Sequence, residues 1–285
     1  MDHRLLELIT PWLRRRHTPP AKPMQVVGDQ ALLRAAGRLG MTPAAAVAAC
    51  LAQDIWPERY AAGRGTWGAV DQARLAGAAV AVIGAGGLGG MVVLQLARLG
   101  VGRLVVCDGD VFDESNLGRQ FLATTDRLGQ NKARCAVDEV ARINPLVTVE
   151  ALPLWAGDNN FGQVLSGVQA AADCLDNLPA RYQLEAAAAH LGIAYVHGAI
   201  AGLEGFVMTV RPGDPGLAGL YGPEPTAKQD SAEVLMGVPT MTPAAVATLQ
   251  VNELVRLILG WDTLASGQVL HLDLSLPEIE TLLLA

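Results

Sequence analysis

The chain has 285 residues, of which 51% are hydrophobic and 17% are charged, and its formal net charge is −7. This length can bury a sizeable core in one large α/β domain or two smaller ones, and the acidic balance argues against nucleic acid as the main partner. The four cysteines form no CxxC pair, so we expect a reducing, cytoplasmic setting and no zinc.

Residues 1–55 are predicted to form a small helical N-terminal extension that packs on the main domain and carries no recognisable chemistry. Thr42 and Pro43 suit the N-cap and first turn of a helix, and Arg14–Arg16 suits a solvated helix end. A secretion signal is not expected, because the segment begins with an acid at Asp2 and has no uninterrupted apolar run. The expected helices cover residues 5–13, 29–39 and 42–53.

Residues 56–285 are predicted to form the main domain. From residue 78 strands and helices alternate, which predicts a Rossmann-like, doubly wound α/β fold with a mainly parallel sheet. The uncharged stretch 75–97 contains six glycines, so a strand–loop–helix unit explains it better than a membrane span. The expected strands are 79–83, 103–107, 147–152, 170–175 and 194–199, and the expected helices are 87–99, 131–143 and 179–191.

After residue 205 the pattern changes. Residues 206–211 predict an added antiparallel strand, and 212–240 form a long loop rich in Pro and Gly, of the kind that is usually functional. A helix over 242–259 follows. The chain then closes with antiparallel strands over 269–274 and 278–284.

A glycine-rich turn follows the first strand of this unit. Gly84, Gly86 and Gly89 form a GxGxxG pattern that also includes Gly87, and Asp108 ends the next strand. Glycines let backbone N–H groups approach a phosphate at a helix N-terminus, and an acid at the second strand end suits a ribose. Taken alone, the pattern predicts a nucleotide site with NAD as the default; a tight turn without a ligand is the alternative.

Charged and amide side chains follow in the next loop and point to chemistry on phosphates. Asp110 is followed by the segment SNLGRQ, which contains Asn116, Arg119 and Gln120, and Lys132 opens the next helix. Cations beside a nucleotide neutralise charge during phosphate chemistry, which hydride transfer does not need. We expect all five side chains at the nucleotide; the alternative is that they are solvated surface residues.

A second acidic pair ends the fourth strand. Asp173 lies within the strand, while Asp176 and Asn177 follow it, so Asp176 is the better placed to hold Mg²⁺ together with substrate phosphates. The alternative is that Asp176 caps the helix that begins before Pro179.

These motifs together resemble the ubiquitin-activating-enzyme superfamily, in its bacterial MoeB/ThiF/HesA adenylyltransferase branch. The resemblance runs from about residue 56 to 260. It rests on GAGGLG, D-x-D, SNLxRQ, Lys132 and DxxDN followed by Arg181, and also on Arg59-Tyr60, Trp67-Gly68, Asp71-Gln72, His197–Ile200, Gly202 and Gly205.

The resemblance implies that the chain binds Mg-ATP and adenylates the Gly-Gly tail of a small ubiquitin-fold sulfur carrier, of the type used in molybdopterin, tungstopterin or thiamine synthesis, releasing pyrophosphate. It implies that Asp108 binds the ribose, that Asn116, Arg119 and Lys132 contact the phosphates, and that Asp176 holds Mg²⁺. Arg119, Lys132 and Asp176 are then the catalytic residues. A homodimer is also implied.

Two departures from the family refine the expectation. No cysteine follows Cys174, so we expect neither the zinc site nor a covalent bond to the carrier. The family's R-Y-x-R-Q motif, whose second arginine reaches the partner subunit's phosphates, appears here as Arg59-Tyr60 followed by two alanines, which leaves Arg64 as a substitute at a different spacing.

Two other functions stay open. One keeps ATP activation but adenylates a peptide or a carboxylate on a tRNA base. The other is a catalytically silent, nucleotide-binding interaction module.

Overall fold

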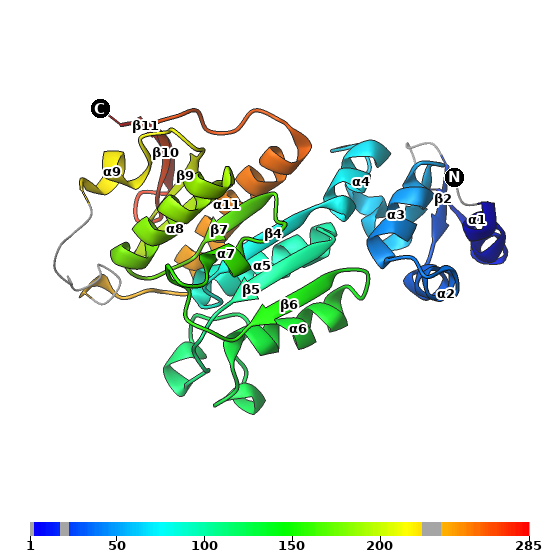
Figure 1. Ribbon diagram of the computed structural model, residues 1–285, viewed down its shortest axis with the longest axis horizontal. Helices are drawn as coiled ribbons and strands as arrows, with labels where there is room; N and C mark the ends of the chain where they lie inside the picture. Colours follow the sequence, from blue (N-terminus) through cyan, green and yellow to red (C-terminus); the bar gives the residue numbers. More distant parts are fainter. Residues whose placement is uncertain (1–2, 18–22, 224–234, 285) are drawn as a thin grey trace.

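The computed structural model describes residues 3–17, 23–223 and 235–284, and within them the chain forms a three-stranded and an eight-stranded sheet. Figure 1 shows the small sheet and its helices at one end of the molecule, beside the N-terminus, and the large sheet forming the rest. Among the described helices, none combines the length and the apolar character that a membrane span needs.

The N-terminal part contains the expected helices and, in addition, three short strands. Arg14–Arg16, expected at a helix end, instead pairs antiparallel with a strand that begins at Met24. Thr42 caps its helix as predicted, since its Oγ1 accepts a hydrogen bond from Ala45 N at 3.2 Å. The elements are α1 (His3–Ile9), η1 (Thr10–Trp12), β1 (Arg14–Arg16), β2 (Met24–Val27), α2 (Asp29–Leu39), α3 (Pro43–Leu51) and β3 (Ile55–Pro57).

The main unit has the predicted alternating architecture. Its sheet has the strand order β11-β10-β9-β8-β7-β4-β5-β6, in which β8, β7, β4, β5 and β6 are parallel. The elements are η2 (Glu58–Gly63), α4 (Ala69–Gly77), β4 (Ala79–Ile83), α5 (Gly87–Leu99), β5 (Arg103–Cys107), η3 (Glu114–Asn116), η4 (Thr125–Arg127), α6 (Lys132–Ile143), β6 (Thr148–Leu152), α7 (Phe161–Val164), β7 (Ala170–Asp173), α8 (Leu178–Leu191) and β8 (Ala194–Ala201).

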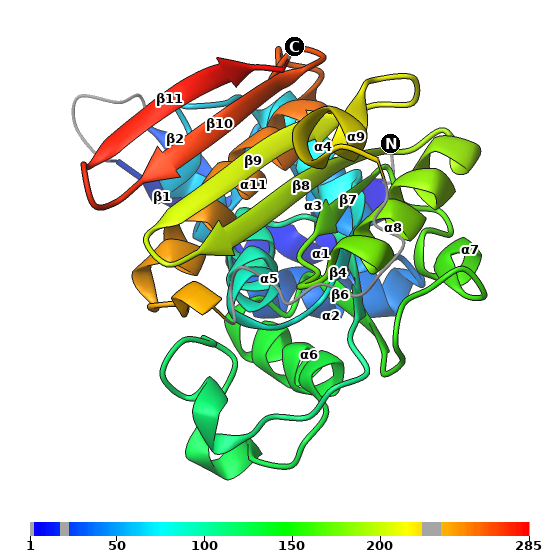
Figure 2. The same ribbon diagram turned by 90° about the vertical axis from the view of Figure 1, so that its left-hand side faces the viewer.

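The C-terminal strands are antiparallel, as expected, and extend the sheet on the β8 side. Figure 2 shows β8 to β11 as a row of strands with β11 at the outer edge. Where it is described, the 212–240 loop contains a short helix; its residues 224–234 lie outside the described part of the chain. The elements are β9 (Glu204–Val210), α9 (Gly216–Tyr221), α11 (Met241–Leu259), β10 (Gln268–Asp273) and β11 (Glu278–Leu283).

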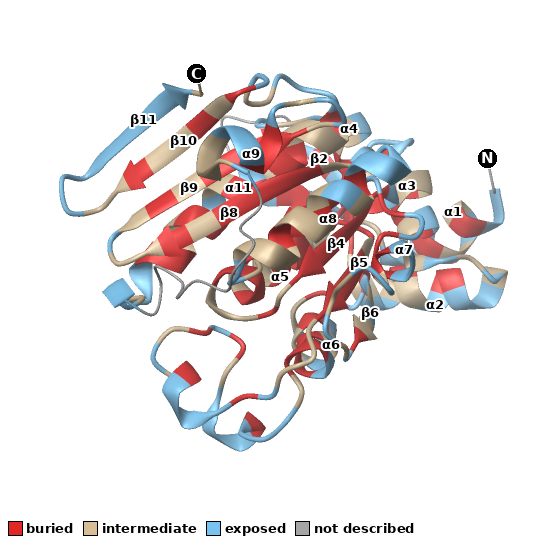
Figure 3. Cartoon of the chain, turned by 60° about the vertical axis from the view of Figure 1, so that its left-hand side comes forward, coloured by how far each residue is buried: buried red, intermediate tan, exposed pale blue. Residues whose placement is uncertain are grey.

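Helices cover both faces of the large sheet. Successive side chains of a strand point to opposite faces, and all five residues of β4 are buried because both faces are covered. Val80 and Val82 pack in one core with α4, α5, α6 and α11, whereas Ala81 and Ile83 pack in another with α7, α8 and α9. In Figure 3 the buried residues concentrate in the central strands, while β11 is exposed. The fold is therefore the predicted doubly wound α/β sheet.

Candidate functional site

A cavity opens at the carboxyl ends of β4, β5 and β7. The strand order changes direction here, because the chain leaves β4 towards β5 and returns on its other side as β7, and open α/β sheets bind ligands at such points. The lining includes nine of the predicted site residues: Gly84, Gly86, Gly87, Asp108, Asp110, Arg119, Gln120, Lys132 and Asp176. The other three predicted residues, Gly89, Asn116 and Asn177, are not part of the lining.

The glycine turn brings β4 against the end of β7. Gly84 has φ +91°, and a Cβ there would lie 2.5 Å from the carbonyl oxygen of Cys174. A Cβ on Gly89 would lie 1.8 Å from the carbonyl oxygen of Gly84, so this glycine lets the first turn of α5 pack on the loop. Gly86 and Gly87, at the start of α5, face the cavity with the helix N-terminus behind them, which suits a phosphate.

We expect Gly89→Ala to destabilise the fold by about 3 kcal/mol or more, because the new methyl group meets backbone that cannot move aside cheaply. Gly118→Ala is the matched control, since a Cβ at Gly118 meets nothing within 4 Å; its effect should stay within about 0.5 kcal/mol. Urea unfolding of both variants measures the difference. Equal stabilities of the two variants would contradict this account of the loop.

Asp108 links the glycine turn to the end of β5. Its Oδ2 accepts a hydrogen bond from Ala85 N at 2.6 Å and its Oδ1 accepts one from Asp110 N at 2.8 Å. Burial raises the pKa of this carboxyl, although both backbone hydrogen bonds act in the opposite direction. A carboxylate has about four acceptor positions, so Asp108 can still accept from a ribose hydroxyl.

Lys132 lies in the cavity at the start of α6. Its side chain is only 7% exposed, and its Nζ lies 2.7 Å from Oδ2 of Asp110, whose side chain is 44% exposed. Asn131, which the sequence analysis missed, caps α6 and also donates to the carbonyl oxygens of Asp108 and Asp110 at 3.0 and 2.9 Å. An Asn directly before a helix is a typical N-cap, and this pattern could have identified Asn131 from the sequence. The ammonium group is therefore held at the cavity with a partner that solvent or substrate can reach.

The SNLGRQ segment divides into residues that face the cavity and one that supports the loop. Arg119 lines the cavity and donates from Nη1 to the carbonyl oxygen of Ser115 at 2.7 Å. Asn116, expected at the phosphates, is 4% exposed, and its Oδ1 accepts from Asp113 N at 3.3 Å. The structure does not bring Asn116 into the cavity, because its amide closes the 3₁₀ turn before Arg119.

Gln120 presents an unsatisfied group at the same cavity. Its side chain is 7% exposed, and its Oε1 is buried without a hydrogen-bond partner among the described residues. Its Nε2 lies 3.6 Å from the position of a Cβ on Gly86, so the amide packs against the glycine turn. Buried acceptors are normally paired, and a donor from a bound molecule would satisfy this one.

The loop after β7 carries the exposed carboxylate of Asp176. The cap of α8 is Asn177, whose Oδ1 accepts from Ala180 N at 3.0 Å, and this removes the alternative that Asp176 is the cap. Asn177 also donates to Asp176 Oδ1 at 3.1 Å. Among the described residues no cluster of three His, Cys, Asp or Glu side chains could hold a metal alone. One carboxylate beside a phosphate site is the donor set that Mg²⁺ uses.

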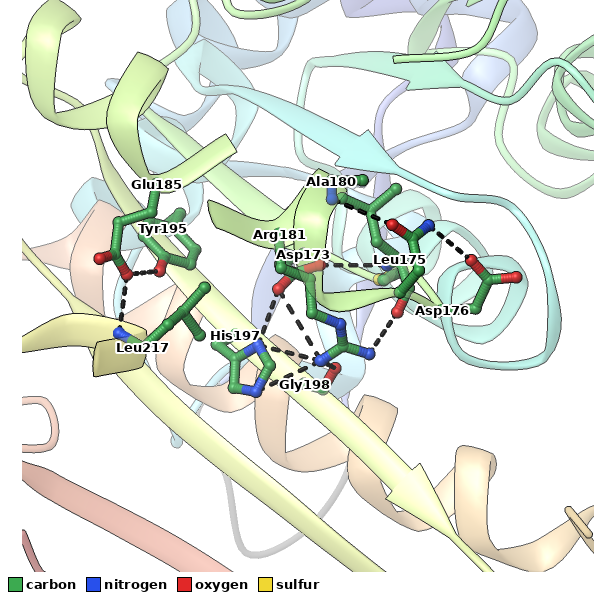
Figure 4. A network of polar contacts seen from close by, with 12 residues as sticks. Asp173, Leu175, Asp176, Ala180, Arg181, Glu185, Tyr195, His197, Gly198 and Leu217 are labelled. Atoms are coloured by element: carbon green, nitrogen blue, oxygen red, sulfur yellow. Dashed lines mark hydrogen bonds and ion pairs between the residues drawn. The ribbon is translucent and has the colours of Figure 1, made fainter. Parts of the chain in front are cut away.

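A buried ionic network, which local sequence patterns do not reveal, lies beside the Asp176 loop and is connected to it through Leu175 (Figure 4). Asp173 and His197 are fully buried, with Nδ1 of His197 2.7 Å from Oδ2 of Asp173. Arg181 lies within 4.0 Å of Asp173 and hydrogen-bonds to His197 and to the carbonyl oxygens of Leu175 and Gly198. The three residues come from different elements, so their spacing in the sequence does not reveal the contact.

The network fixes the Asp176 loop and the helix α9. Asp173 Oδ1 accepts from Leu175 N at 3.0 Å while Arg181 donates to Leu175 O, so the peptide groups on both sides of Leu175, the residue before Asp176, are anchored. Burial would raise the pKa of Asp173, but Arg181 and His197 bring it below its usual value. Burial lowers the pKa of His197, whose Nε2 faces the Tyr221 hydroxyl at 2.9 Å. His197 is therefore neutral at neutral pH.

Arg59 of the entry motif and Arg64, the expected substitute for the trans-acting arginine, both have contacts within their own chain. Arg59 donates from Nε to Asp29 at 2.9 Å and from Nη1 to the carbonyl oxygen of Ile143 at 2.9 Å. Arg64 lies 3.3 Å from Asp54. Neither lines the cavity, so the trans-acting role stays a prediction.

The family match and the similar proteins of known name agree with each other. The chain matches the ThiF family over residues 60–285. It is 38% identical to the SAMP-activating enzyme E1 of Haloferax volcanii, over 71% of this chain and 75% of that protein. It is 37% identical to the sulfur carrier protein adenylyltransferase of Thermus thermophilus, over 71% of this chain and 77% of that protein.

A solved structure supports the fold. E. coli MccB with ATP matches with a TM-score of 0.69 at 18% identity, over 80% of this chain and 72% of that chain. At 18% identity this similarity shows the fold and nothing about function. The family match and the two relatives go further: this chain belongs to the ThiF family and is an E1-like adenylyltransferase of the ThiF/MoeB type.

Proposed function

We propose that the chain activates a small ubiquitin-fold sulfur carrier by adenylating its C-terminal glycine with ATP. One observation carries the proposal: the cavity combines a glycine turn at a helix N-terminus, the cations Arg119 and Lys132, and the exposed carboxylate of Asp176. That set suits a triphosphate and its divalent ion. One relative above 35% identity is named a sulfur carrier protein adenylyltransferase and another a SAMP-activating enzyme E1, which supports this choice of acceptor.

The cavity residues suit an adenine nucleotide in detail. Asp108 would accept from the ribose, Arg119 and Lys132 would contact the phosphates, and Asp176 would hold Mg²⁺, which shields the phosphate charge when bound. The unpaired Oε1 of Gln120 would accept a donor from the bound substrates. Asn116 and Asn177 would act indirectly, by shaping the loops that carry Arg119 and Asp176.

In the proposed reaction a carboxylate oxygen of the carrier's terminal glycine attacks the α-phosphorus of ATP. The bond from that phosphorus to the oxygen bridging to the β-phosphate breaks, and pyrophosphate leaves with the electron pair. The products are acyl-adenylate and pyrophosphate. Arg119 and Lys132 would stabilise the charge that develops on the phosphate oxygens.

The cysteines favour release of the adenylate over capture by the enzyme. Cys107 and Cys174 line the cavity, but burial raises the pKa of Cys107 to about 12 and that of Cys174 well above its usual value. A thiol must ionise to attack, so both are poor nucleophiles near neutral pH. No cysteine follows Cys174 in the sequence. The sulfur group that reacts with the acyl-adenylate would come from another protein. The proposal also includes a homodimeric enzyme in the cytoplasm.

ATP–pyrophosphate exchange tests the proposal. Exchange should require a ubiquitin-fold carrier with a free Gly-Gly end, and a carrier lacking the last glycine should give none. Absence of exchange with every such carrier tried would reject it, and exchange with a peptide or a tRNA carboxylate instead would move the enzyme to another acceptor class. An enzyme that binds NAD but not Mg-ATP would be the silent module.

A further inference from the structure

Trp155 is an exposed indole at the edge of the cavity. It belongs to the segment Leu154–Ala156 that follows β6, all of which lines the cavity, and its side chain is 72% exposed. Tryptophan is usually well buried, so a large exposed aromatic group at a ligand cavity needs an explanation.

The indole lies flat on the backbone of Gly109. A Cβ built on Gly109 would lie 2.8 Å from Cγ and from Cδ2 of Trp155 and 2.9 Å from Cδ1. Because these distances to three ring atoms are nearly equal, one face of the five-membered ring covers Gly109. Gly109 separates Asp108 from Asp110, so the ring sits beside the carboxylate that we assign to the ribose. The large exposed fraction leaves its remaining surface available to a bound molecule.

The segment that carries the ring is held on both sides. The Cys107 thiol donates to the carbonyl oxygen of Leu154 at 3.4 Å, which ties the segment to β5. The Asn160 amide donates to the carbonyl oxygen of Trp155 at 2.8 Å and accepts from Gly157 N at 3.0 Å. The indole is therefore presented by a fixed backbone, and a ligand need not order the loop first.

From this geometry we infer that Trp155 stacks on the base of the nucleotide. The opposite face of its indole packs on the backbone of Gly109, which holds the ring in position. The inference rests on the proposed function, since it takes ATP as the substrate. Trp155 is then a positioning residue that favours a purine, whose two rings offer more stacking area than a pyrimidine. The cations and the carboxylate of the cavity act on the phosphates, so the two ends of the nucleotide are recognised by different chemistry.

Equilibrium binding of ATP to the full chain, without carrier, tests this inference. ATP should quench the tryptophan emission of the wild type, and Trp155→Ala should remove the quench and raise the Kd for ATP by roughly 5- to 150-fold, since stacking is worth ~1–3 kcal/mol per base. Trp155→Phe should keep most of the affinity. Trp12→Ala is the matched control, because Trp12 is 55% exposed and lies outside the cavity; it should leave the Kd unchanged.

Two further measurements separate stacking from a general effect on the cavity. Inorganic tripolyphosphate has no base, so its affinity should be the same in the wild type and in Trp155→Ala. Gly109→Ala keeps the indole, but the new methyl group displaces the ring from the Gly109 backbone. This variant should bind ATP more weakly and tripolyphosphate with unchanged affinity. The preference for ATP over UTP should fall in both variants.

Unchanged ATP affinity in Trp155→Ala would overturn the inference, and so would an equal loss of tripolyphosphate binding. Either result would leave the proposed function standing, because wild-type exchange with the carrier is measured separately. Conversely, ATP binding with the expected quench but no exchange with any carrier would reject the proposed acceptor and retain the stacking.

Discussion

Asp176→Asn should lower carrier-dependent ATP–pyrophosphate exchange by about 10²–10³-fold while leaving the fold intact. Asp176 is exposed, lines the cavity and is not the cap of α8, so the backbone does not need its charge. Asparagine keeps the size of the side chain and removes its charge. The loss should therefore reflect weaker binding of Mg²⁺ at the phosphates, and not a disturbed loop.

Asp138→Asn is the matched control, because Asp138 is an exposed acid on α6 away from the cavity, and it should retain full exchange. A second readout does not depend on turnover. A ligand that binds the folded state raises its stability, so Mg-ATP should protect the wild type against heat more than ATP with a chelator does. That difference should disappear in Asp176→Asn. Exchange within about threefold of wild type would remove Asp176 from the metal site.

The sequence was sufficient for most of the cavity because its residues come from short, local patterns. A continuous apolar run, a glycine turn and a helix of regular period set the bounds of β4 and α5, which agree with the prediction. Acids that directly follow parallel strands must meet at one edge of the sheet, and this placed Asp108 and Asp176 at the same cavity.

Features that depend on contacts between residues far apart in the sequence could not be predicted. Arg14–Arg16 has the composition of a solvated helix end, but pairing with β2 makes it a strand, which no local pattern indicates. Asn116 has a side chain that suits either a phosphate or a turn, and the sequence does not say which partner is nearer. The stacked position of Trp155 depends on a glycine 46 residues earlier, at 109, and on the packing of two loops.

The second large effect concerns stability. Arg181→Ala should lower the free energy of unfolding by about 3–5 kcal/mol, because it removes one partner of a buried ion pair and leaves the Asp173 carboxylate without its main cation. Arg142→Ala is the control: Arg142 is 72% exposed and lies 3.9 Å from Glu139, so its loss should cost at most about 1 kcal/mol. Urea unfolding measures both variants.

The pH dependence of this difference identifies its cause. Arg181 helps to lower the pKa of His197, so its removal should raise that pKa and let a protonated His197 pair with Asp173 at 2.7 Å. A group with a lowered folded-state pKa loses stability as the pH falls below its unfolded value, here 6.5, and a group with a raised pKa gains it. The gap between the wild type and Arg181→Ala should therefore narrow from pH 8 towards pH 5.5. A gap independent of pH would mean that Arg181 acts through packing alone, and that charge does not hold the loop before Asp176.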